Sequence, residues 1–140
     1  SMMNSSFTVK NSAPTVKAFN QLRSLVGWNN ADFNTTQNSI NSSLFWISIF
    51  DETNLIATGR IVGDGAMYFY IQDVIVHPNY QTKGLGKIVM EEIENYLTQH
   101  CKKGSTIGLL SAQGKESFYE QFGYMLRDGK TLGHGMCKFI

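Results

Sequence analysis

The sequence predicts an α+β fold in which helices flank a mixed, mostly antiparallel sheet. Three observations support this prediction. Strand-like runs separated by short turns fill the middle of the chain, a long amphipathic helix follows them, and the order then becomes strand, helix, strand. The chain has 140 residues, enough for a single domain over residues 1–140 with a sizeable core.

The first half of the chain is expected to hold helices before strands, after one short strand at Phe7–Lys10. Pro14 stands where a helix can begin, and apolar residues keep helical spacing from there to Gly27. The polar segment Asn34–Ser43 is expected to form a second helix. Three β-rich segments then follow and are predicted to be strands: Leu44–Phe50, Leu55–Val62 and Ala66–Val76.

The second half is predicted to begin with a central helix from Gly84 to about His100. Its apolar residues fall on one face and form a buried stripe: Leu85, Ile88, Val89, Ile93, Tyr96 and Leu97. A strand at Thr106–Ser111 and a helix at Glu116–Phe122, closed by Gly123, come next. The last expected strands are Tyr124–Leu126 and Gly135–Ile140. A helix between two strands indicates a parallel crossover.

Composition narrows the function classes. The net charge of +1 indicates no general affinity for polyanions, so we expect no nucleic-acid partner. The apolar runs are shorter than a membrane span and no signal-peptide pattern opens the chain, where Ser1 resembles a tag-cleavage remnant. Two distant cysteines favour a reducing cytoplasm, and the three histidines show no metal-ligand spacing. We expect a monomer or homodimer.

The most informative segment joins the strand that ends at Val76 to the central helix. Its residues Gln81-Thr82-Lys83-Gly84-Leu85-Gly86 open onto the helix, and Lys87 follows. Glycines let backbone N–H groups point at a ligand, and the helix dipole adds partial positive charge. Two lysines add full charges. The segment therefore predicts an anion pocket suited to a pyrophosphate.

Spacing excludes one of the three phosphate loops with this general appearance and disfavours a second. A nucleotide-hydrolase P-loop needs glycine where Gln81 stands and Ser or Thr where Ile88 stands. A dinucleotide-binding fingerprint needs a third glycine where Val89 stands. The pattern that remains is Q-x-x-G-x-G at a strand-to-helix turn.

This pattern resembles the acetyl-CoA pyrophosphate loop of the GCN5-related N-acetyltransferase (GNAT) superfamily. A second segment, Ser117-Phe118-Tyr119-Glu120-Gln121-Phe122-Gly123-Tyr124, resembles the "FYEKFGF" element of the same superfamily and follows in the same order. The resemblance implies that acetyl-CoA binds as co-substrate without a metal ion. It also implies splayed central strands, here Ala66–Val76 and Thr106–Ser111, that admit the pantetheine arm. The implied cofactor-binding residues are Val74, Val76, Gln81, Thr82, Lys83, Gly84, Leu85, Gly86 and Lys87.

Acyl transfer needs a neutral amine, a donor for the oxyanion and a proton for the leaving thiolate. Tyr119 matches the family tyrosine that acts as general acid, although it can instead pack beside Phe118 and Phe122. Asp73, on the strand expected to wall the slot, is the candidate base or anchor for the amine. Its alternative role is a strand aspartate satisfied by backbone donors or an arginine.

The expected activity is transfer of an acetyl group from acetyl-CoA to a small primary amine through a ternary complex. A protein N-terminus or lysine is the alternative acceptor. The rival class is a GNAT-like module that binds CoA, or serves in interactions, without turnover. Retention of Tyr119 favours the enzyme. Gly133-His134-Gly135-Met136 resembles a "GPGM" signature of small bacterial GNAT proteins, with His134 in place of the proline.

Overall fold

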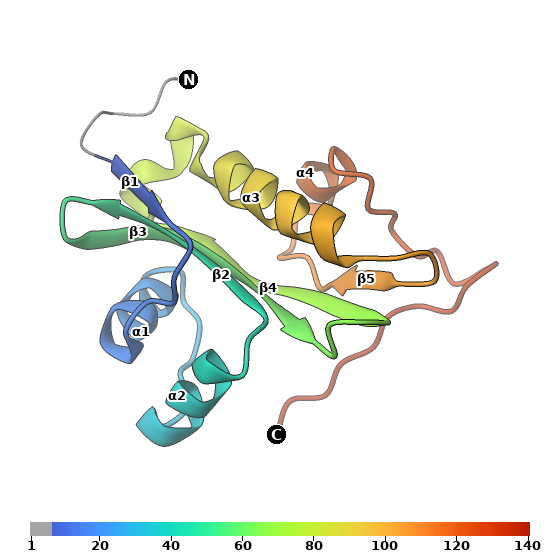
Figure 1. Ribbon diagram of the computed structural model, residues 1–140, viewed down its shortest axis with the longest axis horizontal. Coiled ribbons are helices and arrows are strands. Elements are labelled where there is room, and N and C mark those ends of the chain that lie inside the picture. The colour runs from blue at the N-terminus through green and yellow to red at the C-terminus, as the bar shows by residue number, and fades with distance from the viewer. Residues whose placement is uncertain (1–6) are drawn as a thin grey trace. The chain divides into compact units, whose positions relative to one another are not determined.

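Four antiparallel strands in sequence order form most of the sheet that the sequence predicts (Figure 1). The computed structural model describes residues 7–140, so the expected tag remnant at Ser1 lies outside the described residues. The strands are β1 (Phe7–Lys10), β2 (Phe45–Asp51), β3 (Asn54–Gly63), β4 (Tyr68–Val76) and β5 (Thr106–Leu109). Strand β5 follows β4 in the sheet order.

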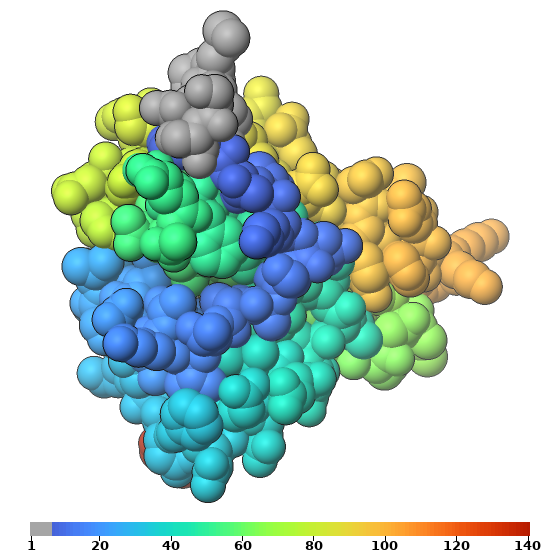
Figure 2. Space-filling view, turned by 60° about the vertical axis from the view of Figure 1, so that its left-hand side comes forward, coloured from blue at the N-terminus to red at the C-terminus, as the bar shows by residue number. Residues whose placement is uncertain are grey.

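The helices are α1 (Val16–Leu25), α2 (Phe33–Asn41), α3 (Leu85–His100) and the short α4 (Glu116–Glu120), with a 3₁₀ helix η1 at Pro78–Lys83. In Figure 1, α1 and α2 lie on one face of the strands β2–β4 and α3 lies on the other. Figure 2 shows α1 and α2, in blue and cyan, at the molecular surface. The predicted fold class, a mostly antiparallel sheet flanked by helices, is confirmed.

Helix α3 lies close to the sheet because β3 carries a glycine beneath it. A Cβ atom added to Gly59 would be 2.6 Å from Cγ1 of Val89 and 3.1 Å from Cδ1 of Ile93. The predicted stripe of α3 is largely correct, with two differences. Met90 is fully buried, whereas Ile88 and Tyr96 are only half-buried. The helix therefore presents a stripe that includes Met90 to the sheet.

The predicted parallel crossover through α3 is present at the start of β5. The Thr106 N–H donates to Met67 O at 2.7 Å, and Ser105 Oγ donates to Ala66 O at 2.8 Å. These bonds bring the beginnings of β4 and β5 together, so the two strands run in the same direction. The expected splay of these strands further along stays a prediction.

The structure divides into two compact units, one ending at Gly108 and the other comprising Leu109–Ile140. The single-domain expectation over residues 1–140 stays a prediction. In the second unit α4 ends at Glu120 with Gln121 as its C-cap, two residues earlier than predicted, and the turn that follows reaches Gly123 with φ of 92°.

The two strands predicted near the C-terminus are wrong. Neither Tyr124–Leu126 nor Gly135–Ile140 forms a strand in the structure. The Tyr124 N–H instead donates to Tyr119 O at 3.4 Å, so it belongs to the helix end. Alternation of apolar side chains identifies a segment that can pair, but only hydrogen bonds to a neighbouring strand make it a strand.

Candidate active site

Strand β4 contains a bulge at the centre of the sheet. Thr58 pairs with Ile75 and Arg60 pairs with Gln72, so β4 has one residue more than β3 over this stretch. Asp73 lies in the bulge with φ of 55°, a left-handed conformation that aspartate tolerates better than most residues. The bulge interrupts β4 directly before Val74, one of the residues expected at the pantetheine arm.

The Asp73 carboxylate is fully occupied by two arginines. Its Oδ1 lies 2.6 Å from Nη1 of Arg23, and its Oδ2 lies 2.8 Å from Nη2 and 2.9 Å from Nε of Arg60. The carboxylate side chain has no exposed surface. An amine therefore has no open oxygen to approach. The geometry favours the ion-pair role over that of a base or substrate anchor.

The glycine loop leads into α3 without a side-chain cap. Gly84 is the N-cap residue with φ of 76°, and no side chain accepts a hydrogen bond from the first turn. Intrahelical bonding begins with Ile88 N–H to Gly84 O at 3.2 Å. The N–H groups before Ile88 have no partner within the helix. Leu85 is fully buried and fixes the helix start to the core, whereas Lys87 is exposed.

Hydrogen bonds fix the segment before Gly84 to the strand ends. Gln81 Nε2 donates to Val76 O at 3.2 Å, so the expected pyrophosphate loop is bonded to the end of β4. The Asn79 N–H donates to Nδ1 of His77 at 3.1 Å. His77 is thus the N-cap residue of η1, at the point where the chain leaves β4.

Tyr80 connects the same segment to the turn between β2 and β3. Its hydroxyl donates to Oδ2 of Asp51 at 2.6 Å, and its ring meets that of Phe7 edge-on at 5.7 Å. This hydrogen bond to the carboxylate raises the pKa of Tyr80 above its ordinary value, and desolvation adds to the effect. Sequence reasoning missed this contact, because nothing in the spacing joins residue 80 to residue 51.

Sequence reasoning allowed for an arginine as the partner of Asp73, but it did not identify Arg23 or Arg60. Arg60 left a signal, because a charged residue in the apolar run Leu55–Val62 needs a buried partner, and Asp73 stands in the next strand. Arg23 left none, because it occupies an ordinary position on a helix that is expected to be half-exposed.

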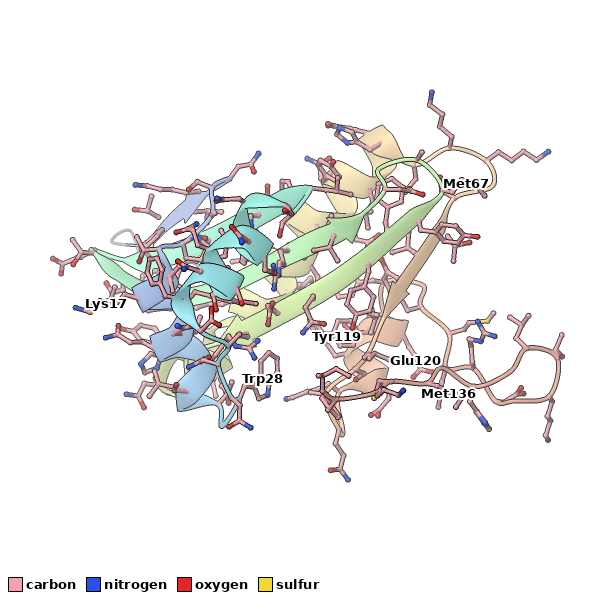
Figure 3. All side chains as sticks on the ribbon, turned by 90° about the horizontal axis from the view of Figure 1, so that it is seen from below. Lys17, Trp28, Met67, Tyr119, Glu120 and Met136 are labelled. Carbon is pink, nitrogen blue, oxygen red and sulfur yellow. The ribbon has the colours of Figure 1, made fainter. Side chains whose placement is uncertain are left out.

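Tyr119 lies in the second unit on α4, where Figure 3 labels it beside Glu120. The helix is short, and the Tyr119 N–H donates to Lys115 O at 3.4 Å. The ring of Phe118 meets Tyr119 edge-on at 5.1 Å and Phe122 at 5.4 Å. Tyr119 is half-buried, so packing with Phe118 and partial exposure of the side chain occur together.

A separate hollow of about 480 Å³ lies in the first unit beside the C-terminal half of α3. Its lining includes Phe45, Tyr96 and His100, whose rings stack in sequence with centroid distances of 4.8 and 3.8 Å. None of the candidate site residues lines it.

Within residues 7–140, no three His, Cys, Asp or Glu side chains are grouped so that they could hold a metal ion. No helix in this described part is both long enough and apolar enough to cross a membrane.

The chain is similar in sequence to proteins named as N-acetyltransferases. An uncharacterized N-acetyltransferase, ycf52, from Porphyra purpurea is 31% identical over 109 residues, which are 75% of this chain and 62% of that protein. A chloroplastic GCN5-related N-acetyltransferase from Arabidopsis thaliana is 34% identical over 83 residues, or 59% of this chain and 41% of that protein. The chain thus spans less than two thirds of the length of these relatives. Because one of them is a chloroplastic protein, a cytoplasmic location for this chain stays a prediction.

The fold agrees with this comparison. A solved structure from meticillin-resistant Staphylococcus aureus, described as "Protein of Unknown Function" and "Probable Acetyltransferase", has a TM-score of 0.86 and 26% identity. The match covers 95% of this chain and 99% of that one. Residues 14–124 match the acetyltransferase (GNAT) family, a range that contains both the glycine loop and the Tyr119 segment. The chain belongs to the acetyltransferase (GNAT) family.

Proposed function

We propose that this protein transfers an acetyl group from acetyl-CoA to a small primary amine within a ternary complex. One observation carries the proposal: in a chain of this family, α3 begins at a glycine and leaves its first backbone N–H groups without a side-chain cap. Such a helix start is the ordinary protein site for a pyrophosphate. In the proposed reaction, this helix start would hold the CoA part of the donor.

The pyrophosphate would lie against the N–H groups of the first turn of α3, next to Gly84 and Gly86. Lys83 and Lys87 would contribute positive charge at the same end. Gln81 would hold the loop in place through its bond to Val76 O. The bulged edge of β4 at Val74 and Val76 would receive the pantetheine amides as an added strand.

The chemistry needs one bond formed and one broken. The neutral amine nitrogen attacks the thioester carbonyl carbon, and the tetrahedral intermediate then expels the CoA thiolate by breaking the C–S bond. Tyr119 donates its phenolic proton to the thiolate sulfur and regains a proton from water. The attacking nitrogen releases its extra proton to solvent, since Asp73 is committed to its arginines.

The acceptor is a small molecule in this proposal, because the near-neutral chain offers no broad acidic surface for a basic protein tail. A screen of free-thiol release from acetyl-CoA over polyamines, amino sugars, amino acids, aromatic amines and lysine peptides tests it. Turnover with lysine peptides alone would replace the small amine by a protein acceptor. CoA binding without thiol release for any amine would favour the non-catalytic module.

Tyr119→Phe tests the acid on the best amine of that screen. We expect kcat to fall about 10²–10⁴-fold while the Kd for CoA stays unchanged, because only the proton donor is lost. Tyr124→Phe, in the same segment, is the matched control and should retain turnover. Equal kcat for wild type and Tyr119→Phe, with chemistry rate-limiting, would assign Tyr119 to packing.

A further inference from the structure

Arg23 contacts the strand bulge and a surface loop at the same time. Its Nη1 is 2.6 Å from Asp73 Oδ1, its Nη2 donates to Asn29 O at 2.6 Å, and its Nε donates to Asn30 Oδ1 at 3.1 Å. Its guanidinium carbon also lies 5.2 Å from the ring centroid of Trp28. Trp28, labelled in Figure 3, and both asparagines belong to the segment between α1 and α2.

The other arginine of the cluster contacts different elements. Arg60 donates through Nε to Asp73 and through Nη1 to Ser39 Oγ at 2.8 Å and Ser43 Oγ at 3.1 Å. Its guanidinium lies over the rings of Phe19 and Trp46. The Arg60 side chain is 10% exposed and that of Arg23 is 20% exposed. Arg60 therefore fixes the bulge to the core and the end of α2, whereas Arg23 fixes it to the loop.

The bulge needs such support. A non-glycine residue with positive φ in the middle of a strand is strained, and it persists only when its surroundings determine it. Asp73 has φ of 55°, and its carboxylate accepts charge-assisted bonds from both arginines. The position of the Trp28–Asn30 loop and the conformation of Asp73 are thus coupled through one guanidinium group.

We propose that Arg23 is a positioning residue that holds the Trp28–Asn30 loop against the β4 bulge, so that this loop shapes the acceptor side of the reaction. The inference rests on the proposed function, because that function places the thioester beside Val74, the residue after Asp73. An acceptor must approach the thioester beside Val74. Arg23 ties the Trp28–Asn30 loop to Asp73, the residue before Val74, so this loop would lie next to the approaching acceptor.

Arg23→Lys tests this coupling, because lysine keeps the charge for Asp73 but lacks the planar fork that reaches Asn29 and Asn30 together. Losing these loop bonds should raise KM for the best amine about five- to tenfold, with the Kd for CoA within about twofold of wild type. Arg60→Lys is the matched control. It removes donors from the same carboxylate and should lower Tm while leaving the amine KM near the wild-type value.

A second readout does not depend on turnover. The chain has two tryptophans, and Trp46 is buried at 5% exposure whereas Trp28 is half-buried. Acrylamide quenching of the intrinsic fluorescence therefore reports chiefly on Trp28. It should increase in Arg23→Lys under conditions where the variant is folded.

The outcomes separate this inference from the proposed function. Unchanged quenching in Arg23→Lys overturns the coupling whether or not any amine is acetylated. Increased quenching with a wild-type amine KM overturns the role in acceptor positioning. An equal loss of CoA affinity and amine affinity in Arg23→Lys would show that Arg23 only stabilises the fold, which contradicts a specific role on the acceptor side. Absence of transfer by the wild-type protein contradicts the proposed function and leaves the quenching result to decide the coupling.

Discussion

Helices α1 and α2 begin in one way, and α3 begins in another. Thr15 Oγ1 accepts the Ala18 N–H at 3.1 Å before α1, and Asp32 Oδ1 accepts the Thr35 N–H at 2.8 Å before α2. Gly84 has no side chain to offer at the start of α3. Glycine at an N-cap costs only a few tenths of a kcal/mol relative to a capping side chain, so α3 leaves its first donors uncapped with little loss of stability. Under the proposed function, the difference separates two helix starts that are closed by a side-chain cap from one whose backbone donors would bind a ligand.

The largest expected effect is on CoA binding at the uncapped start of α3, which we call the open start. Gly86 is the second residue of α3, and under the proposed function a side chain there would stand between the backbone and the pyrophosphate. We expect Gly86→Val to weaken CoA binding about tenfold or more, measured by titration calorimetry, because a 1.4 kcal/mol loss already gives that factor.

Gly86→Ala sharpens the same comparison. Alanine is a better helix former than glycine by about 1 kcal/mol, so this variant should unfold at a higher temperature than wild type. If the site is a ligand site, it should nevertheless bind CoA more weakly. Wild-type CoA affinity in both Gly86 variants would make Gly86 an ordinary helix residue.

The second prediction concerns a capped start. Thr15→Ala removes the acceptor for the Ala18 N–H and should lower the free energy of unfolding by about 1 kcal/mol in chemical denaturation. The Kd for CoA should not change, because Thr15 precedes α1 and contributes nothing to the α3 start. A matching loss of CoA affinity would show that the two kinds of helix start are not functionally distinct.

The smallest effect is a dependence on pH at α2. Hydrogen bonds from Thr35 lower the pKa of Asp32 below its ordinary value of 3.8. The stabilisation is therefore complete above that ordinary value and is lost as pH falls through the lower folded pKa. Asp32→Asn keeps a capping oxygen but cannot titrate. Wild type should exceed the variant in Tm at pH 6, and the difference should shrink towards pH 3; a constant difference contradicts the assignment.

The capped and open starts differ in how far they could be predicted. The α3 start followed from local sequence, because a glycine pair after a strand restricts the backbone geometry there. The first turn of α2 was expected one residue late, at Asn34 rather than Phe33, because the cap residue Asp32 was not recognised. Capping side chains leave a weaker pattern than glycines.

The role of Asp73 could not be predicted from the residues near it in the sequence. A carboxylate in an apolar strand predicts a partner or a function, and the sequence alone left both open. The partners Arg23 and Arg60 are 50 and 13 residues away along the chain. Both distances are bridged only when α1 packs on the sheet and β3 pairs with β4, so the ion-pair role required the folded structure.

The sequence by itself determined the order of strands and helices up to the central helix, the glycine-opened start of α3 and the family resemblance. These features depend on spacing, on glycine and on apolar periodicity, which act over a few residues. Only the tertiary structure decided that Asp73 lies in a bulge between two arginines, that Tyr80 bonds to Asp51, and that Tyr124–Leu126 and Gly135–Ile140 form no strands. Each of these depends on contacts between distant segments, whose pairing no local pattern specifies.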